Sequence, residues 1–303
     1  MKKVFLFFSM IAASLLLTVA CDETNDNTDV VLPDPPTKDA AVSVQFDQGE
    51  KLNLELPDRT KPTDPDAVKT GSTAQVQIRA IDMSENSRYI LYIDDKMTKA
   101  STDIIWTGKF TMSGDVYKLK GFGDLKIDKD KCMISPYPVK AGTGEITLPA
   151  TIKNMKTPDR MAANLARSWK VTRTFLTVTG KVSIEKDFSG CNLEEMARYC
   201  ANNGINIDPS TVAGYSLTEF NFLGNNNMFI VYGNGEEFHG TYNLSSGNIS
   251  WQLNKGNDFL PARATGTISF PKNGETSLTV NFSFTASGEK YNGSATMTIA
   301  QAN

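Results

Sequence analysis

Residues 237–253 read EFHGTYNLSSGNISWQL, and this stretch decides the fold. Apolar residues and one glycine occupy every second position from 238 to 244, and apolar residues do so again from 249 to 253. Alternation with a period of two is typical of a β-strand with one buried and one solvated face. Between the two runs, Ser246-Gly247 suits the positive φ angles that a tight hairpin turn needs. The stretch therefore predicts an antiparallel β-hairpin.

The same alternation continues on both sides of this hairpin. It recurs at residues 169–171, 215–223, 264–270, 278–284 and 291–299, and further turn pairs stand at Asn234-Gly235, Asn273-Gly274 and Ser287-Gly288. Consecutive hairpins form a meander in which each strand pairs with the next. A meander of about eight strands removes its exposed edges by closing into a barrel. We therefore expect a mainly β chain in which residues 165–303 form an up-and-down β-barrel, with a two-sheet sandwich as the alternative.

One short helix is expected within this half, from Leu193 to Asn203. Asn192 can cap its first turn and Gly204 is placed to end it. The predicted inner face holds Leu193, Met196, Ala197 and Cys200 at helical spacing. Nine helical residues span about 13 Å, whereas a disulfide needs Cα atoms within about 7 Å. A bridge between Cys191 and Cys200 would need the chain to fold back, so we expect Cys200 to be a small core residue.

The first half of the chain also alternates in the manner of β-strands. The alternating runs lie at residues 42–46, 52–56, 74–80, 106–112, 117–127 and 146–152. We interpret 117–127 as one long strand, and residues 57–72 as a loop rich in Pro, Asp and Gly. Residues 41–152 are therefore expected to form an N-terminal antiparallel β domain. A brief helix near 161–166 should mark the boundary.

The N-terminus has the features of a secretory leader. Lysines at positions 2 and 3 precede an apolar run from 4 to 20, and Cys21 follows directly. Residues 17–21, LTVAC, resemble the lipobox of bacterial lipoproteins, in which cleavage precedes an acylated cysteine. The resemblance implies that residues 1–20 are a signal peptide, that Cys21 is lipidated, and that residues 21–40 are a flexible tether. We therefore expect the protein to be anchored in the outer membrane, either on its periplasmic face or on the cell surface. The cell-surface alternative comes from a resemblance to surface-exported Bacteroidetes lipoproteins, which have acidic residues after the cysteine, as Asp22 and Glu23 are here.

Trp169 supports a second resemblance. A tryptophan that opens the first strand of an up-and-down meander is similar to the Gly-x-Trp motif of lipocalins, although Arg167 stands where the glycine belongs. The second half of the chain is similar to the lipocalin-like domains of Bacteroidetes lipoproteins. The resemblance implies a cup with an apolar interior that can hold a small hydrophobic ligand. An alternative role for Trp169 is to fill the base of the barrel.

Charge and motif content argue against several functions. The chain has 31 Lys and Arg against 34 Asp and Glu, and loss of the two leader lysines lowers the net charge from −3 to −5. We find no basic stripe, so nucleic-acid binding is disfavoured. His239 is the one histidine, and we find no nucleophile elbow, zinc motif or phosphate-binding loop. Adjacent carboxylates such as Glu236 and Glu237 point to opposite faces of a strand. We therefore expect no enzyme activity, no cofactor and no metal site.

These observations lead to one functional hypothesis and one alternative. The hypothesis is a non-catalytic binding module, attached to the membrane by its lipid, whose barrel holds a small apolar or amphiphilic ligand. Small residues at Gly240, Gly266 and Gly293 are expected to leave room inside. The expected lining residues are Phe238, Tyr242, Trp251, Phe270, Phe282 and Tyr291. The alternative is a structural, adhesive or glycan-contacting envelope protein. It is suggested by the uncharged polar residues on the outer faces of the last two strands. The sequence names no protein partner.

Overall fold

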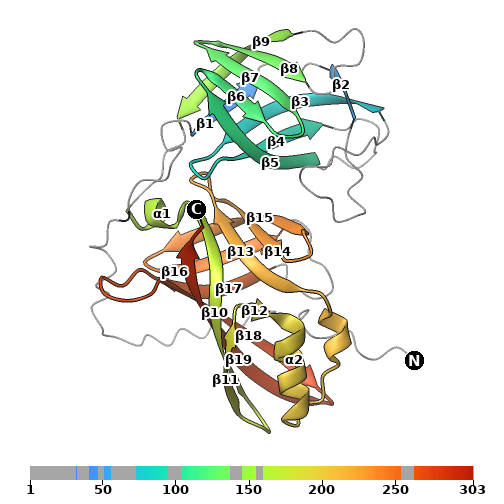
Figure 1. Cartoon of the computed structure of the whole chain (residues 1–303), viewed down its shortest axis with the longest axis vertical. Coiled ribbons are helices and arrows are strands. Elements are labelled where there is room, and N and C mark those ends of the chain that lie inside the picture. Colours follow the sequence, from blue (N-terminus) through green and yellow to red (C-terminus); the bar gives the residue numbers. More distant parts are fainter. Residues whose placement is uncertain are drawn as a thin grey trace. The chain divides into compact units, whose positions relative to one another are not determined.

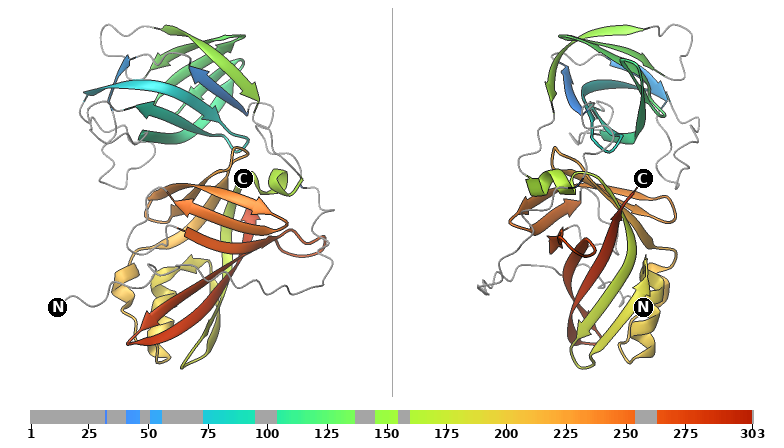
Figure 2. Two further views of the ribbon diagram at one scale, coloured as in Figure 1. Left: turned by 180° about the vertical axis from the view of Figure 1, so that it is seen from behind. Right: turned by 60° about the vertical axis from the view of Figure 1, so that its left-hand side comes forward.

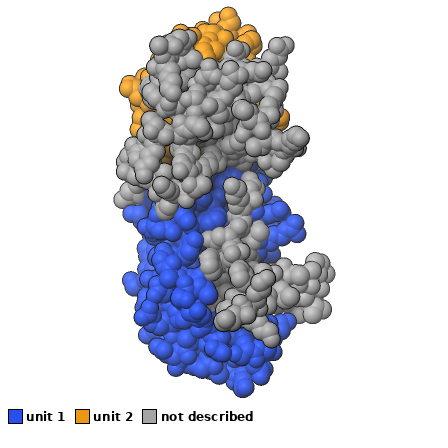
Figure 3. Space-filling model, turned by 90° about the vertical axis from the view of Figure 1, so that its right-hand side faces the viewer, with its two compact units in different colours: residues 1–33, 157–303 blue, residues 34–156 orange. Residues whose placement is uncertain are grey.

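A computed structural model of the chain describes residue 32 and residues 41–46, 51–55, 73–94, 104–136, 145–154, 160–253 and 263–302. The protein is mainly β, as expected, and contains two closed antiparallel barrels of eight strands each. The chain divides into two compact units, residues 34–156 and residues 157–303 together with 1–33 (Figure 3). Each unit contains one barrel and its own core.

The C-terminal unit is an up-and-down barrel, as the turn pairs and the alternation predict (Figures 1 and 2). Its strands are β10 (Ser168–Thr179), β11 (Ile184–Ser189), β12 (Cys191–Asn192), β13 (Ser216–Phe222), β14 (Asn227–Tyr232), β15 (Glu237–Ser245), β16 (Asn248–Leu253), β17 (Arg263–Ser269), β18 (Ser277–Ala286) and β19 (Glu289–Gln301). Strands β13 to β19 pair in chain order, and β10 pairs with both β19 and β13. This double pairing closes the ring and excludes a two-sheet sandwich.

Among the described residues of this unit, three helical segments accompany the barrel. They are α1 (Arg160–Leu165), α2 (Leu193–Asn202) and the 3₁₀ helix η3 (Pro209–Val212). The helix expected at 193–203 is thus confirmed to within one residue. Both α2 and η3 lie in the connection between β12 and β13, so the chain can hold a helix against the barrel without interrupting the ring of paired strands.

The N-terminal unit closes in the same way. Its strands are β1 (Val42–Phe46), β2 (Lys51–Glu55), β3 (Thr73–Met83), β4 (Arg88–Asp94), β5 (Ile104–Ser113), β6 (Val116–Leu119), β7 (Gly123–Asp128), β8 (Lys131–Pro136) and β9 (Ile146–Asn154). Strand β1 pairs with both β3 and β9 and completes the ring, while β2 is added beside β3. The interpretation of 117–127 as one strand was wrong. Gly121 adopts a φ of +79° between β6 and β7, and the chain turns back there.

Inward-facing side chains fill each barrel with a separate core. In the C-terminal unit, Trp169 is 2% exposed and its indole Nε1 donates a hydrogen bond to the carbonyl oxygen of Leu165 at 3.0 Å. Its ring centroid lies 5.8 Å from that of Phe270. Trp169 is therefore a packed core residue tied to the end of α1.

The three glycines expected to leave space inside the barrel do not do so. A Cβ atom at Gly240 would lie 2.2 Å from the carbonyl oxygen of Gln252, and one at Gly266 would lie 2.0 Å from that of Thr279. A Cβ atom at Gly293 would lie 2.5 Å from the ring of Phe282. These glycines allow neighbouring backbones or a ring to approach closely, which is how strands bend in a small barrel.

Little of the predicted membrane-anchoring segment falls within the described residues. The leader at 1–20 and the lipidation site Cys21 lie outside them. Leu32, in the predicted tether, packs against the C-terminal core, and its backbone N–H donates to Asn164 Oδ1 at 3.1 Å. Among the described residues, no helix combines the length and apolar character needed to cross a bilayer.

Candidate functional site

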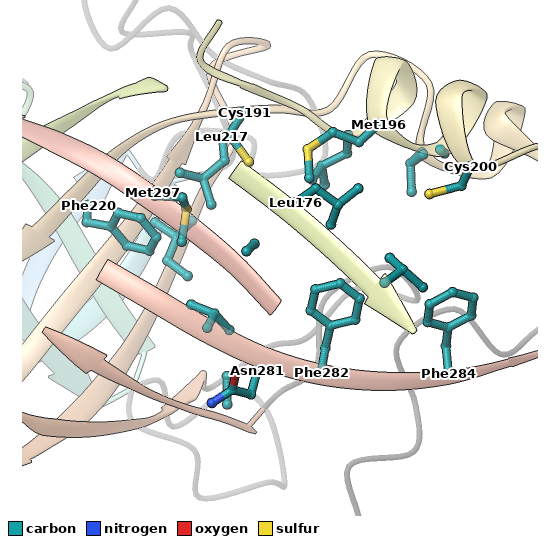
Figure 4. Close-up of a pocket in the computed structure, with 18 of the residues that line it drawn as sticks. Leu176, Cys191, Met196, Cys200, Leu217, Phe220, Asn281, Phe282, Phe284 and Met297 are labelled. Atoms are coloured by element: carbon teal, nitrogen blue, oxygen red, sulfur yellow. The ribbon is translucent and has the colours of Figure 1, made fainter. Parts of the chain in front are cut away.

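A cavity of about 120 Å³ lies inside the C-terminal barrel, beneath α2 (Figure 4). Its walls come from the inward faces of the strands and from the buried side of the helix. The lining residues are Leu176, Val178, Cys191, Leu193, Met196, Ala197, Cys200, Val212, Leu217, Phe220, Ile230, Trp251, Ala264, Val280, Asn281, Phe282, Phe284, Ala295 and Met297. The set is almost wholly apolar and includes the thiols of Cys191 and Cys200.

Helix α2 forms one wall of the cavity because its local sequence specifies both its start and its inner face. The Asn192 side-chain oxygen accepts a hydrogen bond from the backbone N–H of Glu195 at 3.1 Å, which satisfies one donor of the first turn. Met196, Ala197 and Cys200 are the buried residues of the helix, and all three line the cavity. In Figure 4, Met196 and Cys200 point from the helix toward the strands.

Strand β18 forms much of the opposite wall. Phe282 and Phe284 project from it toward the cavity in Figure 4, whereas the Asn281 side chain points away. Strand β17 pairs with β18 only as far as Asn281, so Phe282–Ala286 has β19 alone as its partner among the described strands. The rings of Phe284 and Tyr291 stack with centroids 5.2 Å apart. This aromatic wall is thus supported from β19.

The cavity is lined by uncharged side chains. No Asp, Glu, Lys, Arg or His occurs among the described lining residues. Burial raises the pKa of the Cys191 and Cys200 thiols from 9.0 to about 11, so both are protonated at neutral pH. Cys132, Cys191 and Cys200 are all free. The cavity therefore offers dispersion contacts and soft sulfur atoms, and no charge that could pair with a charged ligand.

Two of the six predicted lining residues, Trp251 and Phe282, do line this cavity. The other four are core or partly buried residues elsewhere in the barrel. Tyr242 packs edge-on against Phe222 and donates its hydroxyl to the carbonyl oxygen of Leu223; Phe270 packs against Trp169; Tyr291 stacks on Phe284; and Phe238 packs edge-on against Tyr232. The structure therefore does not bring the six together around one space.

Sequence reasoning missed the helix as a lining element. The inner-face positions of 193–203 were recognised by their spacing, but they were interpreted only as core. The signal that could have identified a cavity wall is the small Ala197 between Met196 and Cys200, which lets the flexible Met196 side chain and the thiol face the strands.

Other candidate groups remain scattered. His239 is partly buried, with Nε2 2.9 Å from Asn227 Oδ1 and its ring 5.0 Å from that of Phe229. Within the described parts of the chain, no three His, Cys, Asp or Glu side chains converge as a metal site would require. Comparisons with models of known protein families, with curated proteins and with solved structures give no match.

Proposed function

We propose that this chain is a lipid-anchored extracytoplasmic binding protein whose C-terminal barrel holds a small apolar or amphiphilic molecule without chemically changing it. The observation that carries the proposal is the cavity beneath α2, lined by apolar side chains from both the helix and the strands. The anchor is supported by the sequence of residues 1–21. Two or more acyl chains would hold such a protein stably at a membrane.

The cavity volume limits the part of the ligand that is enclosed. An apolar cavity of about 150 Å³ in another protein stays dry and binds benzene or xenon. The 120 Å³ found here is close to that size. It suits one ring or a short stretch of hydrocarbon, with the remainder of a larger ligand outside.

Native mass spectrometry of the full chain, purified from its own host, tests this function. We expect added mass that disappears on denaturation. Ala264 lines the cavity and pairs with Trp251, so Ala264→Leu should fill the space and abolish the added mass. Ala286 is buried in the same core but does not line the cavity, so Ala286→Leu is the matched control. Overpacking costs about 1–3 kcal/mol at either site. Absence of bound mass in the wild type would refute the proposal.

The proposed anchor has a separate test. Replacing Cys21 by Ser removes the sulfur that would be acylated, so we expect loss of radiolabelled palmitate incorporation and release of the protein from the membrane fraction. Unchanged membrane association of this variant would contradict lipid anchoring at Cys21. The result is independent of whether the barrel binds a ligand.

One observation favours the alternative of a glycan-contacting surface. Phe175 on β10 is 37% exposed and lies beside Thr296 of β19, which in turn lies beside Thr279 of β18. Asp187 of β11 lies on the other side of Phe175. An exposed aromatic ring flanked by hydroxyl and carboxylate groups can stack on a sugar, whose hydroxyl groups these neighbours can bind. A glycan array probed with the wild type and with Phe175→Ala tests this role, and signals that are equal for both variants would exclude Phe175 as the contact.

A further inference from the structure

The residues that line the cavity differ in how far they are enclosed. Most of the described lining residues are buried, but three consecutive ones on β18 are not: Val280 and Phe282 are partly exposed, and Asn281 is exposed. The others that are partly exposed are Ala295, opposite Val280 on β19, and Leu193 at the start of α2. Because most of these residues lie on β18 and β19, we place the opening of the cavity beside the middle of β18.

Strands β17 and β18 separate at this opening. The pairing between their described residues ends at Asn281. Beyond that point, Ala264 of β17 and Phe282 of β18 both line the cavity. Successive side chains of a strand point to opposite faces, so their chain neighbours Arg263 and Ser283 lie on the outer face of the barrel. A ligand whose apolar end fills the cavity therefore has a path between Ala264 and Phe282 that reaches the surface beside Arg263.

Arg263 is the one charged residue of strands β16, β17 and β18. Its side chain is exposed, and neither neighbouring strand carries an acidic residue that could face it. Asn281 is diagonal to Arg263 across the sheet, since it pairs with Thr265. Diagonal neighbours lie about 7–8 Å apart, which is within reach of long side chains. In Figure 4 the Asn281 amide also points away from the cavity. A positive charge and an amide thus stand together outside the opening.

We propose that Arg263 binds the carboxylate head of an amphiphile whose apolar tail occupies the cavity, with the Asn281 amide donating a further hydrogen bond. This inference rests on the proposed binding function and specifies its ligand class. The carboxylate would stay at the surface, so it avoids the high cost of burying a charge in the uncharged cavity. A guanidinium can form two parallel hydrogen bonds with a carboxylate. One arginine suits a ligand with a single negative charge.

Calorimetric titration of the full chain at pH 7 with octanoate, octan-1-ol and octylammonium tests the inference, because these probes share one tail and differ in the charge of the head. We expect octanoate to bind most tightly and octylammonium most weakly. Arg263→Gln should lower octanoate affinity by about threefold to tenfold, the value of an exposed charged hydrogen bond. Arg263→Lys should lose less because it keeps the charge. Octan-1-ol affinity should stay within about twofold in both variants.

Arg173 provides the matched control. It is also an exposed arginine, but it lies on β10, and β18 and β19 separate it from β17. Its Nε already pairs with Asp187 Oδ1 at 2.8 Å. Arg173→Gln makes the same change in net charge, so it should leave octanoate affinity unchanged. Ala264→Leu should instead weaken octanoate and octan-1-ol alike, because it fills the space that both tails share.

The outcomes separate this inference from the function on which it depends. If both probes bind but Arg263→Gln does not weaken octanoate more than octan-1-ol, the head site is wrong and the apolar binding function stands. If Arg173→Gln weakens octanoate as much as Arg263→Gln does, only the net charge matters and the site is wrong. Octanoate that binds Ala264→Leu as tightly as the wild type would show that its tail lies elsewhere. If neither octanoate nor octan-1-ol binds the wild type, both proposals fall.

Discussion

Replacing Tyr232 by Phe should stabilise the ligand-free C-terminal barrel, which is an unusual outcome for a fully buried residue. The aromatic contacts survive the change, because Tyr215 and Phe238 pack edge-on against the ring at centroid distances of 5.4 and 5.6 Å. Only the hydroxyl is lost, and it has no partner among the described residues. An unsatisfied buried polar group costs about 1–3 kcal/mol. We therefore expect the free energy of unfolding to rise by about that amount.

Tyr242 provides a control with the opposite sign. It is buried in the same barrel, and its hydroxyl donates to the carbonyl oxygen of Leu223 at 2.9 Å. Tyr242→Phe keeps the edge-on contact with Phe222 but leaves that carbonyl without this donor. We expect a loss of about 1–3 kcal/mol. Two Tyr→Phe substitutions in one core should thus change stability in opposite directions.

Urea unfolding monitored by tryptophan fluorescence measures both changes. Trp169 and Trp251 lie in the C-terminal unit, and a Trp106→Phe background removes the signal of the other unit. The protein should first be unfolded and refolded so that no host ligand remains. If Tyr232→Phe then lowers the unfolding free energy as much as Tyr242→Phe does, the Tyr232 hydroxyl is already satisfied and our reasoning about it is refuted.

Three further predictions concern the helix cap, the glycines and pH. Asn192→Ala should cost about 1 kcal/mol in urea unfolding, because the first turn of α2 loses its cap; an unchanged midpoint would contradict this role. Gly266→Ala should cost about 2–4 kcal/mol, because its Cβ would lie 2.0 Å from a backbone oxygen, whereas Gly233→Ala, with a nearest contact of 3.5 Å, should be tolerated; equal unfolding midpoints would refute the packing argument. Barrel stability should fall as pH rises from about 9 to 11, because thiols ionise near pH 9.0 when unfolded whereas buried Cys191 and Cys200 stay protonated until about 11; Cys191→Ala should weaken this fall in the urea midpoint, its combination with Cys200→Ala should weaken it further, and an unchanged fall in the double variant would contradict the argument.

The strand order of the second half could be predicted because its determinants are local. Ser246 and Gly247 adopt φ angles of +49° and +79°, and Ser287 and Gly288 adopt +51° and +83°. These are the conformations that two-residue hairpin turns need, so the residue types at the turns fix which strands pair. The cap at Asn192 was predictable for the same reason.

The cavity could not be predicted because it depends on contacts between distant segments. Whether Gly266 leaves room or admits a neighbouring backbone depends on the path of β18, which the sequence around Gly266 does not specify. The alternation also identifies Tyr242 and Phe270 as inward-facing without telling which inward residues meet one another. Which inward-facing residues line the cavity depends on the position of α2, which lies across the cavity from Phe282 and Phe284.

The double pairing of β10 has a consequence for how the chain reaches its native state. Strand β10 is the first strand of its barrel, yet its longest partner is the last, with Trp169 opposite Gln301. Nearly the whole domain must therefore be synthesised before the ring can close, and such distant pairings slow folding. Until then the edge of β10 is open to other chains. A protein that ends before β19 would keep that edge exposed, so early termination should favour aggregation over partial activity.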